Sequence, residues 1–195
     1  MTFVTGYNLT KFNRRKDGSS FRDWVSETFE ASLETSSLDR RDIDTLIVSS
    51  ESDFFTLQLN PASVIADDLG LFNIEAVRVE GGGASGQLAV HAGVKSILSG
   101  TSKHVAIIGF DPSASQLPSE TIKKLYSYSF DAWTDGMNGV SATALYALSI
   151  QIFMSDTGLN EYDLANSLYH MYKSQFVCAS IKDKLWYEFV NNKWI

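Results

Sequence analysis

Residues 75–110 read EAVRVEGGGASGQLAVHAGVKSILSGTSKHVAIIGF, and this stretch decides the fold. Apolar and polar residues alternate over 75–80, as in a β-strand with one buried face, and the glycines at 81–83 end that strand. Apolar residues recur at helical spacing over 84–99. The continuous apolar run over 105–110 is typical of a strand buried on both faces. A strand, a helix and a second strand in this order predict parallel pairing through a right-handed crossover.

The chain N-terminal to this stretch continues the alternation of strands and helices. Residues 3–6 are a short strand candidate, and 45–48 (TLIV) form a continuous apolar run of the buried-strand type. Helices are expected over 20–34, with a capping arrangement in the first turn, and over 61–70, which begins with proline and ends with glycine. The sequence therefore predicts an α/β fold with a mostly parallel sheet and helices on both faces.

The sequence changes character after residue 110. A loop follows, and two helices are expected at about 141–156 and 161–178. Residues 181–195 are interpreted as an amphipathic helix or an irregular arm, with no closing strand. We therefore divide the chain into an α/β core over 1–110 and a helical subdomain with a C-terminal arm over 111–195.

The helix expected at 84–99 is apolar around most of its circumference, and only Gln87, His91 and Lys95 form a narrow polar stripe. Such a helix is normally buried from several sides. The sequence thus predicts a second cover over this helix, either a partner polypeptide or residues 111–195 of the same chain.

Composition excludes several classes of function. With 16 Lys+Arg against 23 Asp+Glu the net charge is −7, so nucleic acid is not an expected partner, and the basic run 11–16 is interpreted as a solvated loop. The single cysteine, Cys178, cannot form an internal disulfide, and the His and Cys residues lack the spacing of a zinc site, so no metal is expected. The first residues do not resemble a signal peptide and no apolar run is long enough to cross a membrane, which favours a cytoplasmic protein.

The turn at 81–86, GGGASG, places glycines at a helix N-terminus, where exposed N–H groups favour an anion. No Lys-Ser/Thr follows, so the turn is not a P-loop, and a nucleophile elbow would need glycine at Gln87. The spacing Gly-x-Gly-x-x-Gly matches the dinucleotide fingerprint by letter, but it follows a later strand than the fingerprint requires. A purely structural role, close packing of strand and helix with Ser85 as N-cap, is the alternative.

Segments of the chain, in order, are VTGYNLTKF (4–12), IDTLIV (43–48), RVEGGGASG (78–86) and KSILSG (95–100). They resemble successive landmarks of the thiolase superfamily, in particular archaeal acetyl-CoA acetyltransferases and sterol-carrier-protein type thiolases. Residues 139–148 and 158–164 are similar to that family's loop domain, so the resemblance covers most of the chain. It implies the N-terminal half of a thiolase-like α/β fold with a helical loop subdomain.

The resemblance also implies that the nucleophile is missing. In these thiolases the turn reads Cys-Ala-Ser-Gly, and the cysteine attacks the acyl thioester. Gly83 stands at that position here, so no acyl-enzyme can form there, and Ser85 points elsewhere on the turn. The family's catalytic His and second Cys belong to a C-terminal half that this sequence does not contain. No catalytic residue is therefore expected, and Gly83, Ala84 and Ser85 are at most the turn of an acyl pocket.

Further candidates have ordinary alternatives. Residues 176–179 stand in place of the family's Asn-Pro-Tyr-Ala type segment, and Cys178 is interpreted as a buried structural thiol rather than a relocated nucleophile. His91 is interpreted as a packed or solvated histidine rather than a base. The aromatic cluster between Tyr126 and Trp133 could cover an adenine or an acyl chain, or form the core of the subdomain.

The resemblance leads to two hypotheses of function. The first is a thiolase-like protein that is inactive alone and binds acyl-CoA or serves as a scaffold subunit. The second is a component of a split acetyl-CoA acetyltransferase, or of a thiolase-fold aldolase, with the chemistry on a partner chain. No cofactor is expected beyond coenzyme A or acyl-CoA as a ligand. Expected partners are a second copy through strand 75–80, and a thiolase C-terminal half or a zinc-ribbon/OB-fold scaffold protein.

Overall fold

The structure is a computed structural model, and it describes residues 2–11, 17–135, 141–172, 176–180, 185–190 and 193–194. The chain divides into two compact units, residues 1–132 and 133–195, which we describe separately. Most of the basic run at 11–16 lies outside the described residues, so its interpretation stays a prediction.

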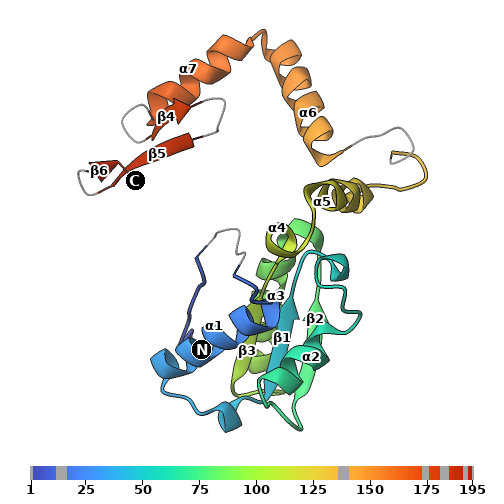
Figure 1. Cartoon of the computed structure of the whole chain (residues 1–195), viewed down its shortest axis with the longest axis vertical. Helices are drawn as coiled ribbons and strands as arrows, with labels where there is room; N and C mark the ends of the chain where they lie inside the picture. Colours follow the sequence, from blue (N-terminus) through green and yellow to red (C-terminus); the bar gives the residue numbers. More distant parts are fainter. Residues whose placement is uncertain are drawn as a thin grey trace. The chain divides into compact units, whose positions relative to one another are not determined.

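A parallel sheet forms the centre of the first unit (Figure 1). Its strands lie in the order β2 (Glu75–Val79), β1 (Thr45–Ser49), β3 (Val105–Gly109). Ile47 on β1 lies between Val77 and Ile107 in the register. This arrangement confirms the predicted parallel sheet. The predicted strand at 3–6 is wrong, because these residues adopt no regular structure and Val4 is 84% exposed.

Helices α1 (Phe21–Ser36) and α2 (Pro61–Asp68) cover one face of the sheet. A capping box formed by Ser20 and Asp23 begins α1, as the sequence predicted, and Pro61 begins α2. The side chains that these helices and the sheet bury together form the main core of the unit: Phe21, Val25, Phe29, Leu46, Val48, Ala62, Ile65, Ala66, Leu69, Leu71 and Ile108.

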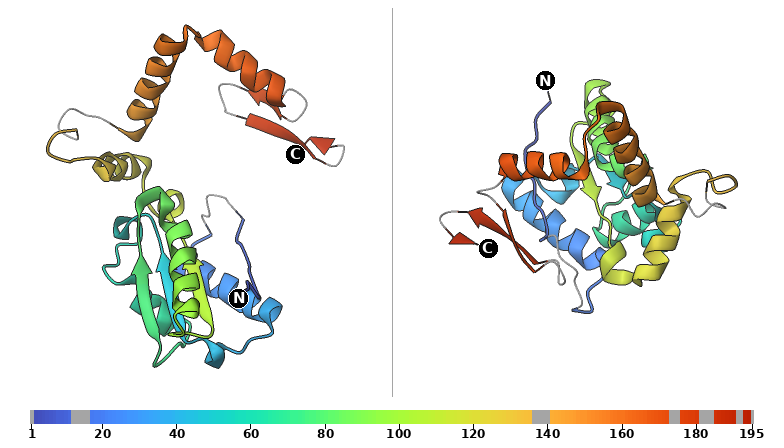
Figure 2. Two further views of the ribbon diagram at one scale, coloured as in Figure 1. Left: turned by 180° about the vertical axis from the view of Figure 1, so that it is seen from behind. Right: turned by 90° about the horizontal axis from the view of Figure 1, so that it is seen from above.

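Helix α3 (Ser85–Leu98) covers the other face of the sheet, on the side away from α1 (Figure 2). Gly93 allows the close approach, because a Cβ there would lie 2.8 Å from Ile107 Cδ1. None of the described residues of the first unit covers the opposite side of α3, where Val90 is 50% and Leu98 67% exposed. The expectation that this helix is buried from several sides is therefore not met inside the unit, which supplies only one layer against it.

Two short helices follow β3, α4 (Ser113–Gln116) and α5 (Ser119–Tyr126), and both belong to the first unit. The division at 132/133 thus lies later than the boundary that we placed after residue 110. One contact that joins α5 to the first unit is that of Tyr126, whose ring centroid lies 5.5 Å from that of Phe55. Short 3-10 turns lie at Arg40–Asp42, Asp53–Phe55, Gly82–Ala84 and Ser127–Ser129.

The second unit contains α6 (Ala142–Thr157) and α7 (Glu161–Tyr172), close to the helices expected from the sequence. Strands β4 (Phe176–Ser180), β5 (Leu185–Val190) and β6 (Lys193–Trp194) then form an antiparallel sheet. The expected helix through residue 178 and the expected helix or arm over 181–195 are therefore wrong. No helix in the described part of the chain has both the length and the apolar character needed to cross a membrane.

Candidate active-site cleft

The turn between β2 and α3 favours glycine at two of its three consecutive positions. A Cβ at Gly81 would collide with Leu88 Cδ1, and Gly82 has a φ of +57°, which favours glycine. A Cβ at Gly83 would meet no atom within 4 Å. Backbone geometry and packing therefore do not explain the glycine at the position where the thiolase resemblance places a nucleophile.

Ser85 fastens this turn to the helix. Its hydroxyl accepts a hydrogen bond from the N–H of Gly81 at 2.9 Å and donates one to the carbonyl of Gly82 at 2.6 Å, and the residue is 4% exposed. The structure places Ala84 at the N-cap position and Ser85 as the first residue of α3, which corrects the expected N-cap by one residue. The hydroxyl is thus occupied by the turn and is directed away from solvent.

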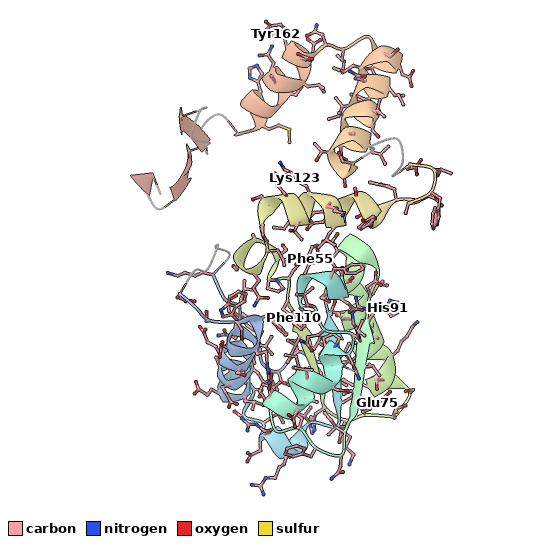
Figure 3. The ribbon with its side chains drawn as sticks, turned by 45° about the vertical axis from the view of Figure 1, so that its right-hand side comes forward. Phe55, Glu75, His91, Phe110, Lys123 and Tyr162 are labelled. Carbon is pink, nitrogen blue, oxygen red and sulfur yellow. The ribbon has the colours of Figure 1, made fainter. Side chains whose placement is uncertain are left out.

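A cleft of about 880 Å³ opens beside Gly83, at the carboxyl ends of β1 and β2. Ligands of open parallel sheets bind at this edge. Figure 3 shows Phe55, one of the lining residues, at the end of the sheet opposite to Glu75, where β2 begins. The cleft is lined by Glu51, Ser52, Asp53, Phe54, Phe55, Leu57, Gln58, Leu59, Arg78, Glu80, Gly82, Gly83, Leu125, Tyr126, Tyr128 and Ser129.

Charged residues from the strand ends lie along one part of the cleft. Arg78 Nε lies 3.0 Å from Asp53 Oδ1, and both side chains are half-buried. Glu80 Oε1 accepts a hydrogen bond from the N–H of Gly82 at 3.1 Å. The ion pair ties the loop after β1 to β2, and the Glu80 carboxylate lies at the N-terminus of α3, where negative charge is stabilised.

Tyr126 closes the cleft on the side of α5. Its hydroxyl donates a hydrogen bond to Glu51, and burial, together with Glu51 and Asp111, raises the pKa of Tyr126 to about 12. Partial burial of its carboxyl raises the pKa of Asp111 above its ordinary value, and the charge of Glu51 raises it further. The N–H of Ser113, 3.4 Å from Asp111 Oδ1, has the opposite effect. The raised pKa of Tyr126 means that its hydroxyl is neutral and can donate a hydrogen bond at physiological pH.

The structure brings together only some of the residues that the sequence singled out. Gly83 lines the cleft with Tyr126 and Tyr128 of the aromatic cluster, whereas Trp133 belongs to the second unit. His91 is exposed on α3 and does not line the cleft (Figure 3). Cys178 lies on β4, and the interpretation of its thiol as buried falls outside what the structure describes.

Sequence reasoning missed the charged residues of the cleft, Glu51, Asp53, Arg78 and Glu80. A signal was present, because Glu51 and Asp53 follow a buried strand and Glu80 follows the next one, so both groups reach the same edge of a parallel sheet. Among the described residues, no group of three or more His, Cys, Asp and Glu side chains is placed to hold a metal ion.

Comparison with known proteins places the chain in a family. No family model matches the chain. The chain is 31% identical over 163 residues to an acetyl-CoA acetyltransferase of Methanocaldococcus jannaschii, a match that covers 83% of this chain and 41% of the relative. It is 30% identical over 163 residues to an acetyl-CoA acetyltransferase of Methanothermobacter thermautotrophicus, covering 83% and 42%. The chain thus spans less than half the length of these relatives.

Among solved structures, 3-oxoacyl-[acyl-carrier-protein] synthase III from Aquifex aeolicus aligns with a TM-score of 0.46 and 15% identity. The alignment covers 54% of this chain and 35% of that protein, and at this score it adds no argument. The sequence matches carry the assignment. On their basis the chain belongs to the thiolase superfamily and corresponds to the N-terminal half of its members.

Proposed function

We propose that this chain is a thiolase-like subunit that binds acyl-CoA with the acyl group in the cleft beside Gly83, and that it performs no acyl transfer by itself. The proposal rests on one observation: a cleft large enough for an acyl chain lies beside a turn that has no nucleophilic side chain at Gly83. The cleft has a volume of about 880 Å³ and aromatic and aliphatic walls, which suit an acyl chain. The turn that enters it presents Gly83. The hydroxyl of Ser85, two residues further along, is held by Gly81 and Gly82.

Calorimetric titration of the full chain with hexanoyl-CoA tests the binding. We expect saturable binding in the wild type, and binding about tenfold weaker in Gly83→Phe, whose ring would fill the cleft from a position where no atom blocks a side chain. Gln87→Phe is the matched control, since Gln87 is exposed on α3 and does not line the cleft. Absence of binding to the wild type, or equal weakening by both variants, would contradict the proposal.

A second function, a component of a split acetyl-CoA acetyltransferase or thiolase-fold aldolase, is favoured by the uncovered side of α3. Val90 and Leu98 are 50% and 67% exposed there. Leaving such side chains in water forgoes about 1.5–3 kcal/mol for each that a partner could bury. We propose that a partner with the character of a thiolase C-terminal half, or a zinc-ribbon/OB-fold scaffold protein, covers this side.

The free edge of β2 supports the proposal of a two-fold dimer through residues 75–80. The N–H of Glu75 donates to Asp44, so residues 75, 77 and 79 face β1 and residues 76 and 78 present their backbone groups at the edge of the sheet. We expect the wild type to sediment as a dimer at micromolar concentration and Ala76→Pro to sediment as a monomer, because proline removes an edge donor and is tolerated on edge strands. An unchanged far-UV circular dichroism spectrum would show that the variant folds, and a monomeric wild type would contradict the dimer.

A further inference from the structure

The cleft carries an excess of negative charge. Of the described residues that line it, three bear carboxylates, Glu51, Asp53 and Glu80, and Arg78 is the only cation. Arg78 is paired with Asp53 at 3.0 Å. The charges of Glu51 and Glu80 are therefore not balanced by any cation within the lining.

The glycine turn lies at the N-terminus of α3, but several of its N–H groups already have acceptors within the chain. The N–H of Gly81 is bonded to Ser85 Oγ, that of Gly82 to Glu80 Oε1, and that of Ala84 to the carbonyl of Gly81. An anion at this terminus would have to replace acceptors that the chain itself supplies. The turn that the sequence marked as a candidate anion site is thus largely satisfied from within.

The pKa values of two groups beside the cleft, Tyr126 and Asp111, are raised in part by nearby carboxylates. After burial, which is the larger cause for both groups, nearby carboxylates raise the pKa of Tyr126 and the pKa of Asp111. Tyr126 is in direct contact with Glu51. A further negative charge brought to this place would meet both repulsion and loss of solvation.

The rest of the lining is mostly apolar and aromatic: Phe54, Phe55, Leu57, Leu59, Leu125, Tyr126 and Tyr128. We propose, building on the acyl-CoA binding proposed above, that the cleft accepts uncharged acyl groups and rejects acyl groups that end in a carboxylate. Glu51 and Glu80 are the residues that determine this specificity. Apolar walls favour the alkyl chain, and the unbalanced carboxylates disfavour an acidic end.

Hexanoyl-CoA and adipoyl-CoA form a matched pair of probes, because they share a six-carbon chain and differ by one terminal carboxylate. In calorimetric titrations of the full chain we expect adipoyl-CoA to bind at least about tenfold more weakly, the order expected for one like-charge contact at a partly solvated site. In the double variant Glu51→Gln/Glu80→Gln we expect the ratio to fall to about threefold or less, the remainder being the cost of desolvating the carboxylate.

The glutamine substitutions preserve the local structure, because each amide oxygen can still accept the hydrogen bond from Tyr126 or from the N–H of Gly82. Glu34→Gln, an exposed position on α1, removes a charge of the same sign elsewhere and should leave the ratio unchanged. Equal affinity of the wild type for the two esters, or an unchanged ratio in the double variant, would overturn the specificity alone. Failure of both esters to bind would overturn the proposed function, and the specificity with it.

Discussion

Incubation of the purified chain with radiolabelled acetyl-CoA is expected to leave no label on the protein. The resemblance to thiolases places their nucleophilic cysteine at position 83, where glycine provides no side chain, and the Ser85 hydroxyl donates to the carbonyl of Gly82 and is buried. Removal of an activated nucleophile lowers the rate of acyl transfer by orders of magnitude. The measurement is acid-precipitable radioactivity, with intact-protein mass spectrometry to detect an added acetyl group.

A cysteine introduced at position 83 provides the positive counterpart. The site has room for it, since a Cβ at Gly83 meets no atom within 4 Å. We expect Gly83→Cys to take up label and Gly83→Ala, its matched control, to remain unlabelled, because only the cysteine supplies a nucleophile for the thioester. An acetyl group found on Ser85 or Cys178 of the wild type would contradict the assignment of an empty nucleophile position.

The second large effect is on stability. Leu46 on β1 is 0% exposed, in the core shared with α1 and α2, so Leu46→Ala should lower the free energy of unfolding by about 3 kcal/mol. Leu59→Ala is the control, because Leu59 is 95% exposed and its truncation should change the free energy by less than about 0.5 kcal/mol. Urea unfolding followed by circular dichroism measures both. A loss below about 1 kcal/mol for Leu46→Ala would show that β1 is not the centre of the core.

The elements with strong local signals were predictable. The run at 45–48 became a strand that is buried at all five positions, and α2 begins at Pro61 as expected. In these segments continuous apolar composition, capping residues and proline act within a few residues, so no distant contact is needed to select the conformation. The parallel order of the sheet follows from the same alternation of strands and helices.

The C-terminal strands show where local signals fail. Leu185, Trp186, Phe189 and Val190 are spaced as on one side of a helix, yet they form β5, which pairs with β4 across an antiparallel ladder. A short apolar segment is compatible with both conformations, and backbone hydrogen bonds to another segment decide between them. The strand predicted at 3–6 was wrong because, among the described residues, no strand of the sheet pairs with this segment.

The sequence by itself determined the parallel α/β core, the glycine turn before α3 and the absence of a side chain at Gly83. Only the tertiary structure decided the character of the cleft. Glu51, Glu80 and Tyr126 are separated by tens of residues, and they meet because the carboxyl ends of β1 and β2 share one edge of the sheet and α5 returns to it. Charge balance and burial at such an edge depend on contacts between distant segments, which local composition does not encode.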